Sequence, residues 1–158
     1  MRTAVDSNIL IDILSPDPAN GSESWAALQS SLKRGPVVAC DVVYGEVAGL
    51  FPTVGEARRV LARLGVEYEP TSERAALQAS RIFRAYQRNG GERIRLAPDF
   101  LVGAHAMDRA DRLLTRDRGF YRAYFRDLLV VEPSMPESSI TAPALVASRA
   151  RLTPQRGR

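Results

Sequence analysis

The side chains best suited to chemistry are four acids that lie next to predicted strand ends or helix starts. Asp6 ends a short hydrophobic segment, Asp99 opens a predicted helix, and Asp117 follows another predicted strand. Glu46 lies about one turn into the helix that follows a buried segment. In a parallel sheet, such positions gather at the carboxyl edge of the strands. Oxygen ligands gathered in this way suit one hard divalent cation, Mg²⁺ or Mn²⁺.

This arrangement of acids favours metal-assisted hydrolysis. Without a cation the carboxylates repel one another, by roughly 4 kcal/mol for two unit charges about 4 Å apart at an effective dielectric constant near 20. A bound cation relieves this repulsion and lowers the pKa of a bound water, which can then attack a phosphodiester. Each acid taken alone has a second interpretation, as a helix cap or a solvated side chain. The prediction therefore depends on the four acids together.

Predicted strands and helices alternate along the chain. We expect strands at 3–6, 36–40, 66–69, 112–115 and 128–132, and helices at 8–14, 23–33, 42–50, 54–64, 73–88, 98–110 and 120–125. Ser7 and Asp41 are the predicted caps of two of these helices, and Pro16, Pro18 and Gly21 are expected to end the first helix. Such alternation within one domain predicts an α/β fold, with a parallel sheet covered on both faces.

Composition narrows the class of protein. The chain has 158 residues, of which 45% are hydrophobic and 25% are charged, as is typical of one globular domain. A single Cys and a single His exclude an internal disulfide framework and a Cys/His zinc site. No apolar run reaches the roughly 18 to 20 residues of a membrane helix. We therefore expect a cytoplasmic protein with no membrane partner.

The positive charge is concentrated at the C-terminal end. The net charge is +4, and residues 134–158 contain four arginines and one acid, which supplies three of the four positive charges. This segment is rich in Ser, Pro and Arg and shows little hydrophobic periodicity. We expect one folded domain at 1–133. The remaining residues, 134–158, are expected to form a tail that is either flexible or folds as a docked helix near 142–152. Net charge by itself is weak evidence for a nucleic-acid partner.

Four segments together resemble a known family. They are VDSNILIDIL near the start, VVYGEV around Glu46, APDFLVGAHA around Asp99 and LLTRDRGF around Asp117. In this order they resemble the PIN-domain ribonucleases, and more narrowly the VapC toxins of bacterial toxin–antitoxin pairs. The resemblance covers about residues 1–133. It implies a three-layer α/β/α sandwich around a parallel sheet of four to five strands, Mg²⁺- or Mn²⁺-dependent endoribonuclease activity, inhibition by a cognate antitoxin, and a homodimer.

The resemblance also assigns roles to single residues. It gives four metal acids and two polar residues that support them: Asp6, Glu46, Asp99, Asp117, Asn8 and Thr115. Asp6 and Asp99 are the expected direct ligands, and the other two acids are expected to complete the site directly or through water. For Arg116, contact with a substrate phosphate and an outward-facing structural role are equally compatible with the sequence.

Two other functions stay open from the sequence. The nearer is a PIN-type nuclease for housekeeping RNA processing that has no antitoxin. The other is a Mg²⁺-dependent phosphatase of the haloacid-dehalogenase type, which needs a second Asp where Asn8 stands and a catalytic Lys. The only lysine, Lys33, is far from the four segments. If the protein is a ribonuclease, its substrate should be single-stranded or looped RNA, because sequence-specific cleavage needs an accessible strand.

Overall fold

A five-stranded parallel sheet forms the centre of the structure, a computed structural model that describes residues 1–15 and 18–133. The strands are β1 (Thr3–Val5), β2 (Val37–Ala39), β3 (Val66–Tyr68), β4 (Arg112–Leu114) and β5 (Val130–Val131). Their order across the sheet is β3-β2-β1-β4-β5, and every neighbouring pair is parallel. The first strand of the chain is therefore the central strand of the sheet.

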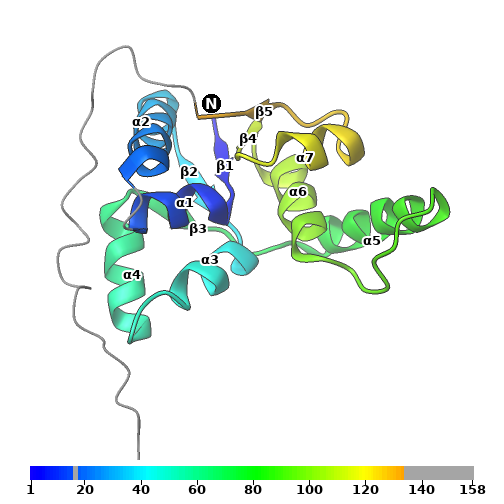
Figure 1. The fold of residues 1–158 in the computed structure, drawn as a ribbon, viewed down its shortest axis with the longest axis horizontal. Coiled ribbons are helices and arrows are strands. Elements are labelled where there is room, and N and C mark those ends of the chain that lie inside the picture. The colour runs from blue at the N-terminus through cyan, green and yellow to red at the C-terminus, as the bar shows by residue number, and fades with distance from the viewer. Residues whose placement is uncertain (16–17, 134–158) are drawn as a thin grey trace, which may run out of the picture.

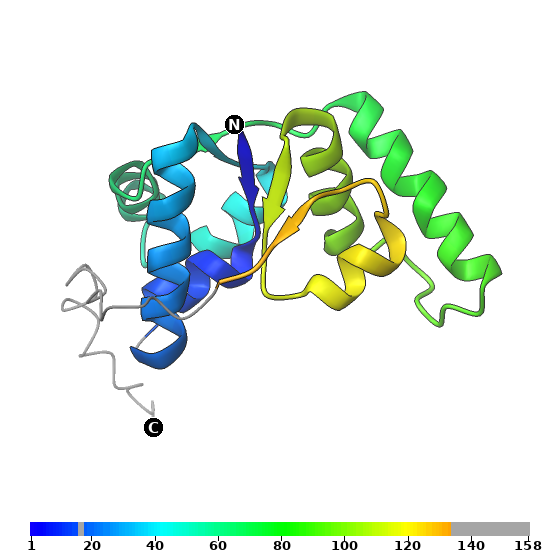
Figure 2. The same ribbon diagram turned by 90° about the horizontal axis from the view of Figure 1, so that it is seen from above.

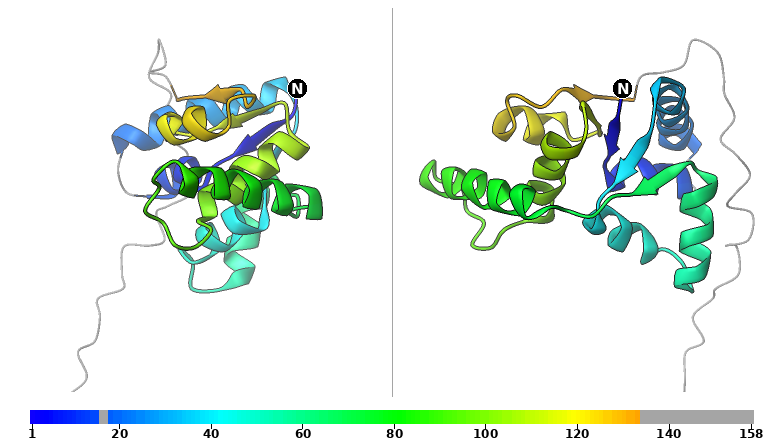
Figure 3. Two further views of the ribbon diagram at one scale, coloured as in Figure 1. Left: turned by 90° about the vertical axis from the view of Figure 1, so that its right-hand side faces the viewer. Right: turned by 180° about the vertical axis from the view of Figure 1, so that it is seen from behind.

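Helices cover both faces of this sheet. They are α1 (Ser7–Leu14), α2 (Pro18–Arg34), α3 (Asp41–Ala48), α4 (Val54–Arg63), α5 (Glu73–Arg88), α6 (Pro98–Arg109) and α7 (Arg118–Tyr124). Helices α1, α2 and α4 lie on one side, and α5, α6 and α7 lie on the other (Figures 1 and 2). Figure 3 shows the same division from the side and from behind. The predicted three-layer α/β/α sandwich is confirmed, with five strands.

The strands are buried because both faces of the sheet are covered. All three residues of β1, β2 and β4 are buried, so these strands show no alternation of buried and exposed positions. The two buried polar side chains, Thr3 and Arg112, hydrogen-bond to each other at 2.8 Å. Strand β5 is shorter than the predicted strand at 128–132. No helix in the described ranges is both long and apolar enough to cross a membrane.

Two predicted helix starts are wrong. The N-cap of α1 is Asp6, whose side chain accepts a hydrogen bond from the backbone N–H of Ser7, so Ser7 is already the first helical residue. Helix α2 begins at Pro18, five residues before the predicted start, because proline is favoured in the first turn of a helix, where its missing N–H would have no partner. Pro18 and Gly21 therefore belong to α2 and do not end α1.

The cap of α3 also differs from the prediction. Cys40 occupies the N-cap position and makes no capping hydrogen bond through its side chain, and Asp41 is the first residue of the helix. The Asp41 carboxylate instead accepts hydrogen bonds from the backbone N–H and the hydroxyl of Thr71, at 2.8 and 2.6 Å. It thereby ties the start of α3 to the segment that precedes α5.

Aromatic side chains join α5, α6 and α7 into one packed layer. Phe100 of α6 lies 5.3 Å from Phe83 and 5.0 Å from Phe120, measured between ring centres, and both pairs meet edge to face. Gly103 permits this packing, because a Cβ atom there would overlap the ring of Phe125. The layer holds the starts of α6 and α7, each of which carries one of the predicted acids, beside the sheet.

Candidate active site

Asp6 is the centre of a hydrogen-bonded cluster at the end of β1. Its side chain is almost completely buried, since the residue is only 6% exposed. One carboxylate oxygen accepts from the Ser7 N–H at 2.8 Å. The other accepts from the Asn8 amide at 2.8 Å, the Thr115 hydroxyl at 2.7 Å and the Tyr121 hydroxyl at 3.3 Å. Four donors therefore fix the orientation of one buried carboxylate.

Asn8 and Thr115 connect the two central strands of the site. The Asn8 amide nitrogen also donates to the Thr115 hydroxyl oxygen at 3.1 Å, and the Asn8 carbonyl oxygen accepts from the backbone N–H of Arg116 at 3.2 Å. The same Thr115 oxygen accepts from the backbone N–H of Asp117 at 3.0 Å. Because β1 and β4 are neighbours, residues distant in sequence meet here at one edge of the sheet.

Burial and hydrogen bonding act in opposite directions on Asp6. Burial raises the pKa of the Asp6 carboxyl, and the negative charge of Asp99 raises it further. The hydrogen bonds from Thr115, the Ser7 N–H and Tyr121 lower that pKa, and the effect of burial is the larger. A nearby cation would favour the ionised form of this carboxyl.

Asp99 and Asp117 lie at the starts of helices α6 and α7. Asp99 is in the first turn of α6, with its side chain 41% exposed, and it forms an ion pair with Arg93 at 2.8 Å. Asp117 is the N-cap of α7, where it accepts from the backbone N–H of Phe120 at 3.2 Å. Each acid caps or begins a helix, as the structural interpretation of these positions predicts, and their role at a metal site stays a prediction.

Tyr121 joins the site although it was not among the residues predicted from the sequence. Burial raises the pKa of the Tyr121 phenol far above its usual value, and the charges of Asp6, Asp99 and Asp117 raise it in addition. The hydroxyl therefore stays protonated and donates to Asp6. One signal was present in the sequence, because Tyr121 lies four residues after Asp117 and so faces the same side of α7.

Glu46 is the one predicted acid that stands apart from this cluster. It is exposed on α3, and its side chain has no hydrogen-bond or ion-pair partner among the described residues. The structure thus brings together five of the six predicted residues: Asp6, Asn8, Asp99, Thr115 and Asp117. The role of Glu46 stays a prediction.

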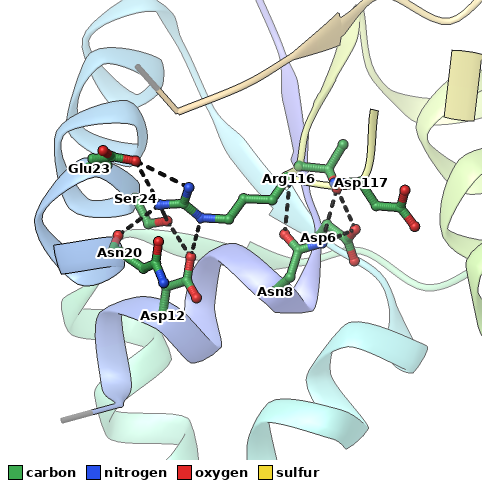
Figure 4. A network of polar contacts seen from close by, with 9 residues as sticks. Asp6, Asn8, Asp12, Asn20, Glu23, Ser24, Arg116 and Asp117 are labelled. Carbon is green, nitrogen blue, oxygen red and sulfur yellow. Dashed lines mark hydrogen bonds and ion pairs between the residues drawn. The ribbon is translucent and has the colours of Figure 1, made fainter. Parts of the chain in front are cut away.

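Arg116 has the structural role. Its guanidinium extends away from Asp6 and contacts Asp12 of α1 and Glu23 of α2 (Figure 4). It also donates to the backbone carbonyl of Asn20 at 2.9 Å and to the Ser24 hydroxyl at 3.2 Å. Through these contacts the Arg116 guanidinium anchors the segment after β4 to α1 and α2. The backbone N–H of Arg116 orients Asn8.

The donors at this site are compatible with a divalent cation. No three His, Cys, Asp or Glu side chains come close enough together to hold a metal ion within residues 1–15 and 18–133. Mg²⁺, however, is commonly held by one or two carboxylates, with waters and substrate phosphates completing its shell. Asp6 and Asp99, whose charges act on each other, provide two such carboxylates. The chemistry of the donor set therefore fits Mg²⁺ or Mn²⁺.

Comparison with known protein families matches residues 3–126 to the PIN domain. Among curated protein sequences, none matched. The matched range contains all six predicted site residues and ends before the segment 134–158.

Solved structures with this fold include toxin–antitoxin proteins. The chain is similar to the VapBC2 protein of Rickettsia felis bound to promoter DNA, at 15% identity and a TM-score of 0.64, over 84% of this chain and 98% of that one. It is similar to VapBC-1 of nontypeable Haemophilus influenzae, at 18% identity and a TM-score of 0.63, over 84% and 98%. It is also similar to VapC20 of Mycobacterium tuberculosis, a toxin that cleaves the sarcin–ricin loop, at 16% identity and a TM-score of 0.56, over 80% and 98%.

Proposed function

Because this chain belongs to the PIN-domain family, we propose that it is a metal-dependent endoribonuclease and the toxin of a toxin–antitoxin pair. The observation that carries the proposal is the buried Asp6 carboxylate, which four hydrogen-bond donors hold in place within the field of the Asp99 charge. Few structural roles require an acid to be buried at a cost and then fixed so completely. A site for a cation explains both features.

Each site residue has a distinct part in this proposal. Asp6 and Asp99 hold Mg²⁺ or Mn²⁺, and Asp117 and Glu46 complete the site directly or through water. Asn8, Thr115 and Tyr121 orient Asp6 by hydrogen bonds. When bound, the cation supplies an activated water and stabilises the negative charge that develops on the phosphodiester.

The distribution of charge supports RNA as the substrate. Residues 73–96, which form α5 and the loop leading to Asp99, contain six arginines and two acids. The rest of residues 1–133 has more acids than basic residues, so the positive charge of the body is concentrated beside the acid cluster. A basic surface next to carboxylates suits a polyanion, because it attracts the phosphates that the acids alone would repel.

The partners follow from the same proposal. The solved relatives from Rickettsia felis and Haemophilus influenzae are VapBC proteins, which supports a cognate antitoxin for this chain, and we include a homodimer on the same ground. The phosphatase alternative has no comparable support, because Asn8 is used as a hydrogen-bond donor to Asp6. The housekeeping nuclease remains the second candidate.

The direct test is incubation of the purified chain with total RNA and Mg²⁺ or Mn²⁺, followed by mapping of the new RNA ends. We expect cleavage by the wild-type chain and none by Asp99→Asn or Asp6→Asn. Asp99→Asn is the cleaner change, since the Asp99 side chain is partly exposed and the loss of its charge leaves the fold intact. Asp127→Asn is the matched control, because Asp127 is an exposed acid outside the cluster. Full cleavage by Asp99→Asn would contradict the assigned site.

A second experiment separates the toxin from the housekeeping nuclease. Expression of the wild-type chain alone should arrest bacterial growth, and co-expression of a small neighbouring gene should relieve the arrest. Cleavage in vitro without growth arrest would favour the housekeeping role.

A further inference from the structure

The loop between α5 and α6, residues 89–97, brings an arginine to the acid cluster. The guanidinium of Arg93 lies 2.8 Å from the carboxylate of Asp99. The backbone of Arg93 is also held, because its N–H donates to the Tyr86 hydroxyl at 3.4 Å and its carbonyl accepts from the Gln87 amide at 3.3 Å. Two contacts from α5 therefore position the residue whose side chain reaches Asp99.

The guanidinium of Arg93 lies in the field of more than one acid. It lies 5.8 Å from the centre of the Phe120 ring, a cation–π distance, and Phe120 is held against Asp117 by its backbone N–H. Asp99 raises the pKa of Arg93 by hydrogen bonding, and the charge of Asp117 also raises it. The positive charge of Arg93 is thus paired with one of the acids that the cation would need and acts on a second.

No other arginine in residues 1–15 and 18–133 forms an ion pair with a proposed metal acid. Arg116, which directly precedes Asp117 in the sequence, instead forms ion pairs with Asp12 of α1 and Glu23 of α2. Arg95, two residues after Arg93 in the same loop, is exposed and forms no ion pair within the described ranges. The contact with Asp99 therefore belongs to Arg93 specifically and does not come from the general charge of the loop.

We propose that Arg93 is a built-in counter-ion of the site, which neutralises Asp99 in the metal-free protein and competes with the cation for that carboxylate. This inference rests on the proposed function, since it takes Asp99 as a metal ligand. The Asp99 carboxylate cannot pair fully with both Arg93 and the cation, so binding of the cation weakens or breaks the ion pair with Arg93. Arg93 thereby stabilises the acid cluster before metal binding and sets the metal concentration at which the site fills.

The test compares Arg93→Gln with Arg95→Gln, which removes the same charge from the same loop. Titration of each metal-free protein with Mn²⁺ by calorimetry should show binding about 1.4- to fivefold tighter for Arg93→Gln than for the wild-type chain, because a partly exposed ion pair of this kind contributes about 0.2 to 1 kcal/mol. Arg95→Gln should bind as the wild-type chain does. The difference should shrink at high salt, which screens the competing pair.

Thermal melts provide a readout that does not depend on cleavage. Without metal, Arg93→Gln should melt below Arg95→Gln, because the repulsion among the acids is no longer offset. Saturating Mn²⁺ should remove most of this difference. A purely structural role for Arg93 would lower the melting temperature equally with and without Mn²⁺ and leave the affinity unchanged, which would overturn the inference. If the wild-type chain binds no Mn²⁺, both the proposed function and this inference fail. If the wild-type chain and Arg93→Gln bind Mn²⁺ equally, only the inference is overturned.

Discussion

Thr115 shows how much of the site depends on single hydrogen bonds. Its hydroxyl donates to Asp6 at 2.7 Å and accepts from both Asn8 and the N–H of Asp117. It is completely buried, so none of these bonds is replaced by water if the hydroxyl is removed. Hydrogen bonds to a charged group contribute about 1.5 to 3 kcal/mol. One hydroxyl therefore couples the charge of Asp6 to the position of α7.

We predict that Thr115→Val shifts the acid limb of the pH–cleavage profile toward higher pH, whereas Thr115→Ser leaves it near the wild-type position. The Thr115 hydrogen bond lowers the pKa of Asp6. Without this hydrogen bond the pKa of Asp6 rises, so Asp6 remains protonated up to a higher pH. A protonated Asp6 cannot hold the cation. Valine matches the shape of threonine without the hydroxyl, and serine keeps the hydroxyl. Cleavage rates measured across the pH range with all three proteins check the shift, and an unmoved acid limb in Thr115→Val would contradict it.

Among single residues, the sequence predicted those with a recognisable type and spacing. Asp6 was predicted because an acid follows a strand end, and Asn8 and Thr115 because the resemblance to the PIN-domain ribonucleases implies polar residues there. The structure brings the three together by hydrogen bonds. Tyr121 and Arg93 were not selected, because an aromatic residue in a helix and an arginine in a loop have many ordinary roles. Their part in the site comes from contacts made only in the folded chain, with Asp6 for Tyr121 and with Asp99 for Arg93. No local sequence pattern predicts these contacts.

At the scale of elements, α5 combines a packed face with a basic face. Ala75, Ala79 and Phe83 are buried toward α6, whereas Arg81 and Arg84 are exposed and form no ion pair in the part of the chain that the structure describes. The helix extends away from the sheet, and the loop that follows it returns to the start of α6 (Figures 1 and 3). If the proposed function is right, we expect the RNA phosphates to lie on this face while the RNA strand reaches the acids.

We predict that the triple variant Arg81→Gln, Arg84→Gln, Arg88→Gln weakens RNA binding and reduces its dependence on salt. Each lost phosphate contact with a single strand should lower the slope of log K against log salt by about 0.7. The binding should be measured in the Asp99→Asn background, so that the RNA is not cut, by fluorescence anisotropy at several salt concentrations.

The matched control changes three exposed arginines of α4: Arg58, Arg59 and Arg63. Helix α4 lies on the opposite side of the sheet from α5 (Figure 1). We expect the control to bind RNA nearly as the unsubstituted protein does. Equal losses in both variants would mean that net charge alone matters, and that the face of α5 has no special role.

Element types were easier to predict than element boundaries. The helices at 54–64 and 73–88 were predicted almost to the residue. Each follows a residue of a type that commonly caps helices, and in the structure Thr53 and Ser72 do accept hydrogen bonds from the first turns. The start of α2 was missed because Pro18 can either end one helix or begin the next. Only the path of the chain decides between these roles.

At the scale of the whole molecule, the sequence predicted a parallel sheet covered on both faces but not the order of its strands. Alternation of strands and helices shows that the strands are parallel. It contains no information about which strands become neighbours, since β1 and β4 are as regular locally as β2 and β3. The order β3-β2-β1-β4-β5 nevertheless decides the site, because it makes the ends of β1 and β4 adjacent.

The segment 134–158 lies outside the described residues, so its role stays a prediction from the sequence. We expect truncation after Pro133 to weaken RNA binding and flatten its salt dependence, while cleavage at saturating RNA stays nearly unchanged. The reason is that this segment supplies three of the four net positive charges and contains no predicted metal acid. If residues 142–152 instead form a docked helix, truncation would lower the melting temperature or dissociate a dimer with little change in the salt slope. Thermal melts and salt titrations of the truncated protein distinguish the two.

The central place of β1 also determines when the site comes into existence during synthesis. Thr115 is 109 positions beyond Asp6, and β4, which pairs directly with β1, is equally distant along the chain. A ribosome adds about 5 to 20 residues per second, so Asp6 emerges several seconds or more before the residues that orient it. A nascent chain that ends before β4 has its first acid but neither Thr115, Asp117 nor Tyr121. If the proposed function is right, we therefore expect no RNA cleavage by the growing polypeptide until translation has passed α7.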